Sequence, residues 1–155
     1  MKALSIQQPW AWAILDGRKR VENRTWLTHH RGPLLIHAGN SRKWYRALRG
    51  KTLPDGSPLP PEDYLHFGAI LGVVQLRECV ELAEPEGAPL RADPFASGPV
   101  CWVLAEPRRF PSPIPFKGQV TLFEVSEHIA RQAAGVPVQL SRSAWSSAGL
   151  TGLTK

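Results

Sequence analysis

The 155-residue chain contains no long hydrophobic run. Its longest apolar stretches, residues 11–15 and 69–74, fall far short of the roughly 20 residues that an α-helix needs to cross a membrane. The first residues, Met-Lys-Ala-Leu-Ser-Ile-Gln-Gln, have neither the apolar segment nor the cleavage site of a signal peptide. We therefore expect a cytoplasmic protein without a membrane segment.

Cysteine and metal-binding patterns are scarce as well. The chain has two cysteines, Cys79 and Cys101, and they form no paired motif. A zinc site needs more ligands at close spacing. The sequence contains no His-x-Glu, His-x-x-x-His or Cys-x-x-Cys pattern, no Gly-x-Ser-x-Gly elbow and no phosphate-binding P-loop. We expect two buried free thiols, no metal and no other cofactor.

Acidic residues are almost absent from the first third of the chain. Residues 1–50 hold ten Lys and Arg against two acids, a local net charge of +8, whereas residues 51–155 hold nine against eleven, a net of −2. Phosphates favour clustered cations because binding releases counterions. The asymmetry therefore favours RNA or a nucleotide as the partner. The alternative is a basic surface that only keeps the protein soluble.

Short strands and short helices follow one another irregularly along the chain. Without a regular strand–helix–strand repeat, a doubly wound parallel sheet is disfavoured. We expect an α+β fold: a small, mostly antiparallel β-barrel of five or six strands with two or three short helices at its openings. With no internal repeat or domain boundary, residues 1–155 form a single predicted domain. Predicted strands cover residues 2–6, 21–26, 33–38, 68–76, 100–105 and 119–125, and predicted helices cover 10–16, 42–49 and about 128–134.

Three local signals add detail to this pattern. Gly17 is placed to end the first helix in a left-handed turn. Gly72, in the middle of the strongest predicted strand, indicates a bulge or a close approach of another backbone. The proline-rich residues 111–118 predict a stiff turn that carries Lys117.

Residues 17–24, Gly-Arg-Lys-Arg-Val-Glu-Asn-Arg, gather four cations around one carboxylate. If residues 21–26 are extended, Glu22, Arg24 and Trp26 share one face, and Lys19 can reach the same side. Such a face suits a base with its phosphate: Arg for the phosphate, Glu for an exocyclic amine and Trp for stacking. The alternative is a salt-bridge cluster that only orders the loop.

Other candidate residues have two interpretations each. Trp10 and Trp12 lie on nearly opposite faces of the first helix, so we expect one in the core and the other over a pocket. His37, in mid-strand, is either a core histidine or part of a site. Lys117, beside Gly118, is either a presented cation or an ordinary exposed lysine.

An ordered series of motifs carries a family resemblance. It comprises Leu-Ser-Ile-Gln-Gln-Pro-Trp-Ala-Trp-Ala-Ile-Leu-Asp-Gly from Leu4, then Gly17-x-Lys19-x-x-Glu22-x-Arg24, then Arg-Gly-Pro-Leu-Leu-Ile-His-Ala from Arg31. The chain resembles the ASCH domain family, which has a PUA-like β-barrel and Gly-x-Lys-x-x-Glu-x-Arg as its signature loop. The resemblance covers about residues 2–126. Residues 127–155 form a C-terminal extension without a match.

The resemblance implies a cleft between the first helix and the barrel that binds RNA or a nucleotide. Lys19, Glu22 and Arg24 would line it. The further candidate contacts are Trp10, Trp26, His37 and Lys117.

The resemblance also implies an enzymatic alternative. Some small ASCH proteins are amidohydrolases that act on N4-acylated cytidines with a lysine, a threonine and a glutamate, and ribonuclease activity is claimed for others. Lys19 matches the lysine and would be the general base, activated by neighbouring cations. Glu22 occupies the position of the threonine and would orient the substrate or relay a proton. Thr25 is out of register.

Overall fold

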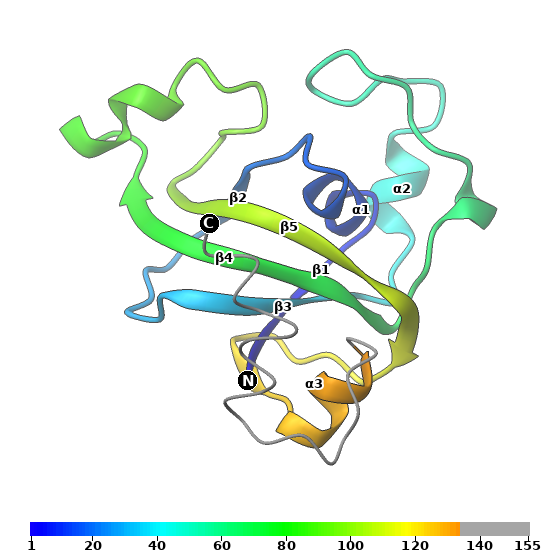
Figure 1. Ribbon diagram of the computed structural model, residues 1–155. Coiled ribbons are helices and arrows are strands. Elements are labelled where there is room, and N and C mark those ends of the chain that lie inside the picture. The colour runs from blue at the N-terminus through cyan, green and yellow to red at the C-terminus, as the bar shows by residue number, and fades with distance from the viewer. Residues whose placement is uncertain (134–155) are drawn as a thin grey trace.

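A six-stranded sheet forms the centre of the computed structural model, which describes residues 1–133 (Figure 1). The strand order is β2-β5-β4-β3-β1-β6; only β1 and β3 pair in parallel. The strands are β1 (Lys2–Ile6), β2 (Val21–Arg24), β3 (Gly32–Ala38), β4 (Ala69–Glu81), β5 (Val100–Pro115) and β6 (Phe123–Glu124). The helices are α1 (Trp10–Leu15), α2 (Lys43–Ala47), α3 (Glu127–Ala133) and the 3₁₀ turns η1 (Glu62–Tyr64) and η2 (Pro85–Leu90).

The predicted α+β class, the mostly antiparallel pairing and the six strands are confirmed, but the sheet is not closed into a barrel. Closure would require the first and last strands of the order to pair. Here β2 and β6 lie at opposite edges, and each pairs with a single neighbour. β2 has four residues and β6 has two, so neither edge offers a long ladder for closure.

The sheet buries side chains on both faces, which explains why its central strands read as continuous hydrophobic runs. Leu4 and Ile6 join the core on the side of α1, whereas Ala3 and Leu35 join a second cluster that includes Ala130 of α3. In Figure 1, α1 and α3 accordingly lie on different sides of the sheet. A third cluster, with Trp12 and Tyr45, holds α1 against α2.

Gly72 confirms the predicted irregularity in β4. A Cβ added there would collide with the backbone carbonyl oxygen of Arg108 on β5. The register of β4 against β5 also shifts on both sides of this residue. The close approach of two backbones therefore requires glycine at this position.

The chain near residues 111–118 differs from the predicted turn. Residues 111–115 continue β5, with Ile114 opposite Ile70 of β4. Proline is tolerated there because β2 pairs with β5 between residues 100 and 103, and beyond residue 103 no strand of residues 1–133 pairs with that edge of β5. The strand predicted over residues 119–125 is reduced to β6.

The predicted helices are present, with small changes at their ends. Gly17 has a φ of +81° directly after α1, which confirms the predicted left-handed helix end. Helix α2 is shorter than residues 42–49. Helix α3 occupies residues 127–133, and the last predicted residue of that helix and the rest of the extension lie outside the described residues.

Both cysteines are free: Cys101 is buried and Cys79 is half-buried. Burial raises the pKa of both thiols. Among residues 1–133 no helix has the length and hydrophobicity that a membrane crossing requires.

Candidate functional site

The end of α1 places Lys19 inside the protein. After Gly17, the amides of Arg18 and Lys19 both donate to the carbonyl oxygen of Ala13, at 3.1 and 3.0 Å. These bonds satisfy the helix end and turn the chain back toward the sheet. The Lys19 side chain is only 4% exposed as a result.

Lys19, Glu22 and Arg24 form a buried charge cluster. The Lys19 ammonium donates to the carbonyl oxygen of Val21 and to Oε1 of Glu22, the latter at 2.9 Å. Nη2 of Arg24 lies 3.2 Å from Oε2 of Glu22 and donates to the carbonyl oxygen of Ser5 at 2.8 Å. Each carboxylate oxygen of Glu22 thus contacts one cation. The predicted grouping of these three residues is present, and it is also an ion-pair network.

This charge cluster lies at the wall of a cavity of about 660 Å³. Such a volume is within the range of about 300 to 1,000 Å³ typical of small-molecule sites. Within residues 1–133, two cations and one carboxylate are its charged lining residues, so this part of the lining carries a net charge of +1. Segments from across the chain contribute the other lining residues: Ser5, Ile6, Gln7, Trp10, Asn23, Gly39, Asn40, Ser41, Trp44, Pro54, Pro94, Phe95, Ser97, Gln119 and Val120.

The other two cations of the signature loop do not line this cavity. Arg18 pairs with Asp16 at 2.6 Å, and its guanidinium lies 5.5 Å from the ring centre of Trp12. Arg20 is exposed and lines a different, smaller cavity. The composition of the loop therefore overstates the positive charge of the main cavity.

Asn23, between the two charged residues of β2, ties a distant loop to the site. Its Nδ2 donates to the carbonyl oxygen of Phe95 at 2.8 Å, and its Oδ1 accepts from the amides of Ser97 and Gly98, each at 2.9 Å. This loop supplies one wall of the cavity. Asn23 therefore positions this loop. It was not predicted from the sequence, because residue 23 is one of the positions marked x in the signature motif, where any residue is allowed.

Aromatic side chains form a second wall. Trp10 lies with its ring centre 6.2 Å from that of Trp44 and 6.5 Å from that of Phe95, both in edge-on geometry. Trp12 is buried, so the expected division between the two tryptophans of α1 is present. Trp44 and Phe95 were not predicted from the sequence as part of the site. The available signal for Trp44 was an aromatic residue among the cations of residues 42–46.

Trp26 does not line the cavity. Its ring packs edge-on against Trp102, with the ring centres 4.7 Å apart, and its carbonyl oxygen accepts a hydrogen bond from Nε1 of Trp102 at 3.1 Å. The strand ends at Arg24, so the expected continuation of one extended face to Trp26 is absent. Trp26 extends the hydrophobic core instead.

His37 is buried at 1% exposure and does not line the cavity. Its Nε2 donates to the carbonyl oxygen of Phe116 at 2.6 Å, which leaves Nδ1 to accept from the Ser5 hydroxyl at 2.9 Å. Burial lowers the pKa of His37, although the bond to Phe116 acts in the opposite direction. His37 holds the segment that continues to Gln119 and Val120 at the cavity rim. Lys117 is exposed and is not a lining residue.

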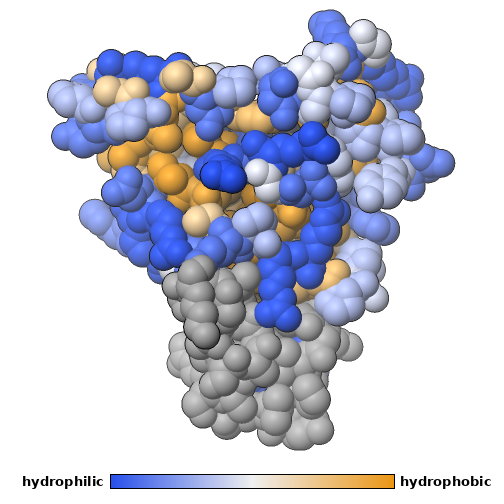
Figure 2. All heavy atoms as spheres, turned by 45° about the horizontal axis from the view of Figure 1, so that its top comes forward, coloured by the Kyte–Doolittle hydropathy of each residue, from blue (hydrophilic) through white to orange (hydrophobic). Residues whose placement is uncertain are grey.

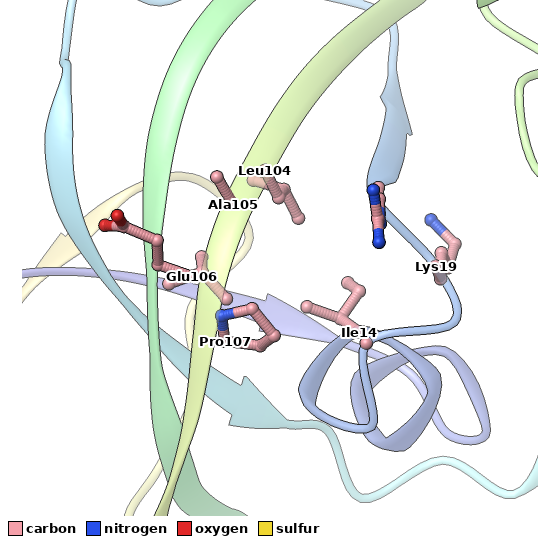
Figure 3. Close-up of a pocket in the computed structure, with 9 residues that line it drawn as sticks. Ile14, Lys19, Leu104, Ala105, Glu106 and Pro107 are labelled. Atoms are coloured by element: carbon pink, nitrogen blue, oxygen red, sulfur yellow. The ribbon is translucent and has the colours of Figure 1, made fainter. Parts of the chain in front are cut away.

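A smaller cavity of about 310 Å³ lies on another side of Lys19. Figure 3 shows Ile14 of α1 facing Leu104 and Pro107 of β5 across it, whereas the Glu106 carboxylate points away. Figure 2 shows hydrophobic residues in a hollow with a hydrophilic rim on one face of the molecule. Lys19 lines both cavities. Within residues 1–133, no group of three or more His, Cys, Asp or Glu side chains could hold a metal ion.

The mostly antiparallel sheet, with the signature loop leaving the first helix, is consistent with a PUA-like class of domain. The family model of the ASCH domain matches residues 4–114. The chain therefore belongs to the ASCH domain family.

Relatives and solved structures agree with this assignment. The chain is 30% identical over 140 residues to activating signal cointegrator 1 from Homo sapiens and to its counterpart from Mus musculus; each alignment covers 84% of this chain. The chain spans only 23% of the length of these curated relatives.

Two solved structures share the fold. The crystal structure of ASCH from Zymomonas mobilis has a TM-score of 0.52 at 14% sequence identity. The superposition covers 86% of this chain and 93% of the Zymomonas mobilis chain. A mutant of the same Zymomonas mobilis protein has a TM-score of 0.51 at 14% sequence identity, and the superposition covers 86% of this chain and 94% of the mutant chain.

Proposed function

We propose that the 660 Å³ cavity binds RNA or a nucleotide, with Arg24 as the principal contact to phosphate or to a base carbonyl. The observation that carries the proposal is the fixed position of the Arg24 guanidinium. One of its nitrogens, Nη2, serves both Glu22 and the Ser5 carbonyl, so the group is oriented before a ligand arrives. A preorganised guanidinium loses little entropy when it binds an anion.

Glu22 has two roles in this proposal. Its carboxylate orients both Lys19 and Arg24, and it adds a hydrogen-bond acceptor to a cavity that otherwise favours anions. A pure phosphate site gains nothing from a carboxylate, whereas a site that contacts an exocyclic amine does. The charge cluster thus suits a ligand that carries both a base and a phosphate.

Binding of a short labelled RNA, measured by fluorescence anisotropy across a salt series, tests the proposal. Affinity should fall steadily between about 50 and 200 mM salt, because phosphate contacts release counterions. Arg24→Lys keeps the charge but loses the planar fork, and we expect about a tenfold or greater loss of affinity. Arg77→Lys is the matched control, because Arg77 pairs with Glu106 outside the cavity. Absence of binding by the wild type to both RNA and mononucleotides would refute the proposal.

A hydrolase or ribonuclease is the second candidate. The Lys19–Glu22 contact of 2.9 Å favours this candidate, because a proton could pass between the two groups. In the structure, however, the Lys19 ammonium donates to two acceptors, and an ammonium has no lone pair, so Lys19 would first have to lose a proton before it could act as a general base. Thr25 is exposed and does not line the cavity. Incubation with N4-acetylcytidine or with RNA, followed by chromatography, tests this candidate. It fails if the wild type forms no product or if Lys19→Ala turns over equally fast.

A further inference from the structure

The rim of the main cavity exposes large hydrophobic side chains. Four large hydrophobic residues are strongly exposed among residues 1–133, and two of them, Trp44 at 51% and Val120 at 89%, line this cavity. An exposed tryptophan leaves a large apolar surface in water, and such surfaces gather where a partner covers them. The cavity mouth therefore offers an aromatic surface for a ligand.

The position of Trp44 is fixed by the packing of its neighbours Tyr45 and Trp10. The next residue, Tyr45, is buried, and its hydroxyl donates to the carbonyl oxygen of Pro60 at 2.6 Å. The Trp44 ring also meets Trp10 edge-on. A ring that is fixed by its helix and by a neighbouring ring loses little freedom when a flat ligand stacks on it. The exposed indole is thus a prepared surface and not a loose side chain.

The cations next to Trp44 are of two kinds. Arg42 and Arg49 both pair with Glu62, at 3.2 and 3.3 Å, and serve the packing of α2. Lys43 and Arg46 are exposed and make no ion pair within residues 1–133. Neither lines the main cavity. Arg46 also lines a separate cavity with Glu62 and Asp63. Both cations lie within two residues of Trp44 along the chain and are exposed, so both can reach an anion outside the main cavity.

We propose that the ligand is single-stranded nucleic acid, with an unpaired base stacked on Trp44 and the adjoining phosphates beside Lys43 and Arg46. This inference rests on the proposed function and narrows it. A base within a duplex has both faces covered by its neighbours and cannot offer one to an indole. A free nucleoside or mononucleotide would use the cavity but would have no use for cations outside it.

The test compares a short single-stranded oligonucleotide, its duplex and the matching mononucleotides, using anisotropy for the oligonucleotides and tryptophan fluorescence for all. Trp44→Ala should weaken single-strand binding by about 5- to 100-fold, the usual effect of losing one base–aromatic stack. Trp44→Phe should keep most of the affinity, because a phenyl ring still stacks, and should lose the quenching that Trp44 contributes. Binding of the duplex should be weaker and unaffected by either substitution.

Tyr64→Ala is the control for the loss of an exposed aromatic ring, since Tyr64 is 63% exposed and does not line the cavity. It should bind like the wild type. Lys43→Ala and Arg46→Ala should each reduce the slope of log affinity against log salt for the single strand. All four substituted residues have exposed side chains, so circular dichroism and a thermal melt should show that the five variants are folded.

Each result has a distinct meaning. Wild-type binding that is unchanged in Trp44→Ala, or equal for single strand and duplex, overturns this inference and leaves the proposed function standing. Mononucleotide binding as tight as that of the single strand, with no effect of Lys43→Ala or Arg46→Ala, identifies a free nucleotide as the ligand and also overturns it. Absence of any nucleic-acid or nucleotide binding by the wild type overturns both proposals.

Discussion

The ammonium nitrogen of Lys19 lies 2.9 Å from Oε1 of Glu22, and both side chains are at most 10% exposed. Nη2 of Arg24 meets the other carboxylate oxygen. One carboxylate therefore serves two cations in a place where an unpaired charge would be costly. The signature motif is for this reason a structural element as well as a candidate binding site, and its variants have to be judged by stability as well as by binding.

Replacing Glu22 by glutamine should strongly destabilise the protein. Glu22→Gln keeps the shape of the side chain but leaves Lys19 and Arg24 without a counter-charge in a buried position. We expect the free energy of unfolding to fall by about 3 kcal/mol. Urea unfolding followed by circular dichroism measures it.

Glu124→Gln is the matched control for that variant. Glu124 also contacts two cations, Lys2 and the N-terminal amine, but its side chain is 65% exposed. Exposed ion pairs contribute little, so the change should cost about 0 to 1 kcal/mol. An equal loss in the two variants would contradict the view that burial makes Glu22 important.

Trp26→Ala should reduce stability without weakening nucleic-acid binding by the folded protein. Trp26 packs on Trp102 and lies away from the cavity, so we expect a loss of about 2 kcal/mol in the free energy of unfolding. Trp10→Ala, at the cavity wall, should weaken binding. Affinity measured well below each variant's melting temperature distinguishes the two. Weaker binding by Trp26→Ala than by Trp10→Ala would contradict the assignment.

Gly72→Ala should disturb the sheet. The added methyl group would meet the Arg108 carbonyl and the Leu15 side chain, and overpacking of this kind costs about 1 to 3 kcal/mol. Gly39→Ala is the control, because its Cβ would be 3.5 Å from the nearest atom, the Ser5 hydroxyl oxygen, which is an ordinary contact. Thermal melts of both variants test the prediction, and an unchanged melting temperature for Gly72→Ala would refute it.

His37 should make stability depend on pH in weakly acidic solution. Burial lowers its folded-state pKa below the ordinary value of 6.5, so the unfolded chain binds more protons in this range. The free energy of unfolding should therefore decrease as the pH falls from about 7 to about 5. Glu124 also has a lowered pKa, but it acts only as the pH falls below its ordinary value of 4.5.

Urea midpoints across that pH range measure the effect. In His37→Gln the decrease in the free energy of unfolding toward acid should be smaller than in the wild type. The variant itself should start from a lower stability, because two partly buried hydrogen bonds change. His29→Gln is the control, because His29 is exposed and lies outside the helices and strands, and this variant should keep the wild-type dependence. The same pH dependence in His37→Gln as in the wild type would exclude His37 as its source.

Much of the local structure follows from short-range signals in the sequence. Apolar runs, proline and glycine mark β1, α1, β3 and the end of α1 at Gly17, because these preferences depend on a few neighbouring residues. The signature motif likewise brings Lys19, Glu22 and Arg24 together, since they share one turn and one short strand. Short-range signals could not predict whether the sheet closes into a barrel, because closure depends on whether the two edge strands, β2 and β6, meet.

Only the tertiary structure decides which aromatic residues face the cavity. The partner of Trp26 is Trp102, 76 residues further along the chain, and no local pattern around Trp26 indicates that contact. Trp44 reaches the cavity because α2 packs beside α1, which likewise depends on long-range contacts. Sequence spacing determines which residues can share a face, but the surroundings of that face come from segments far away in the chain.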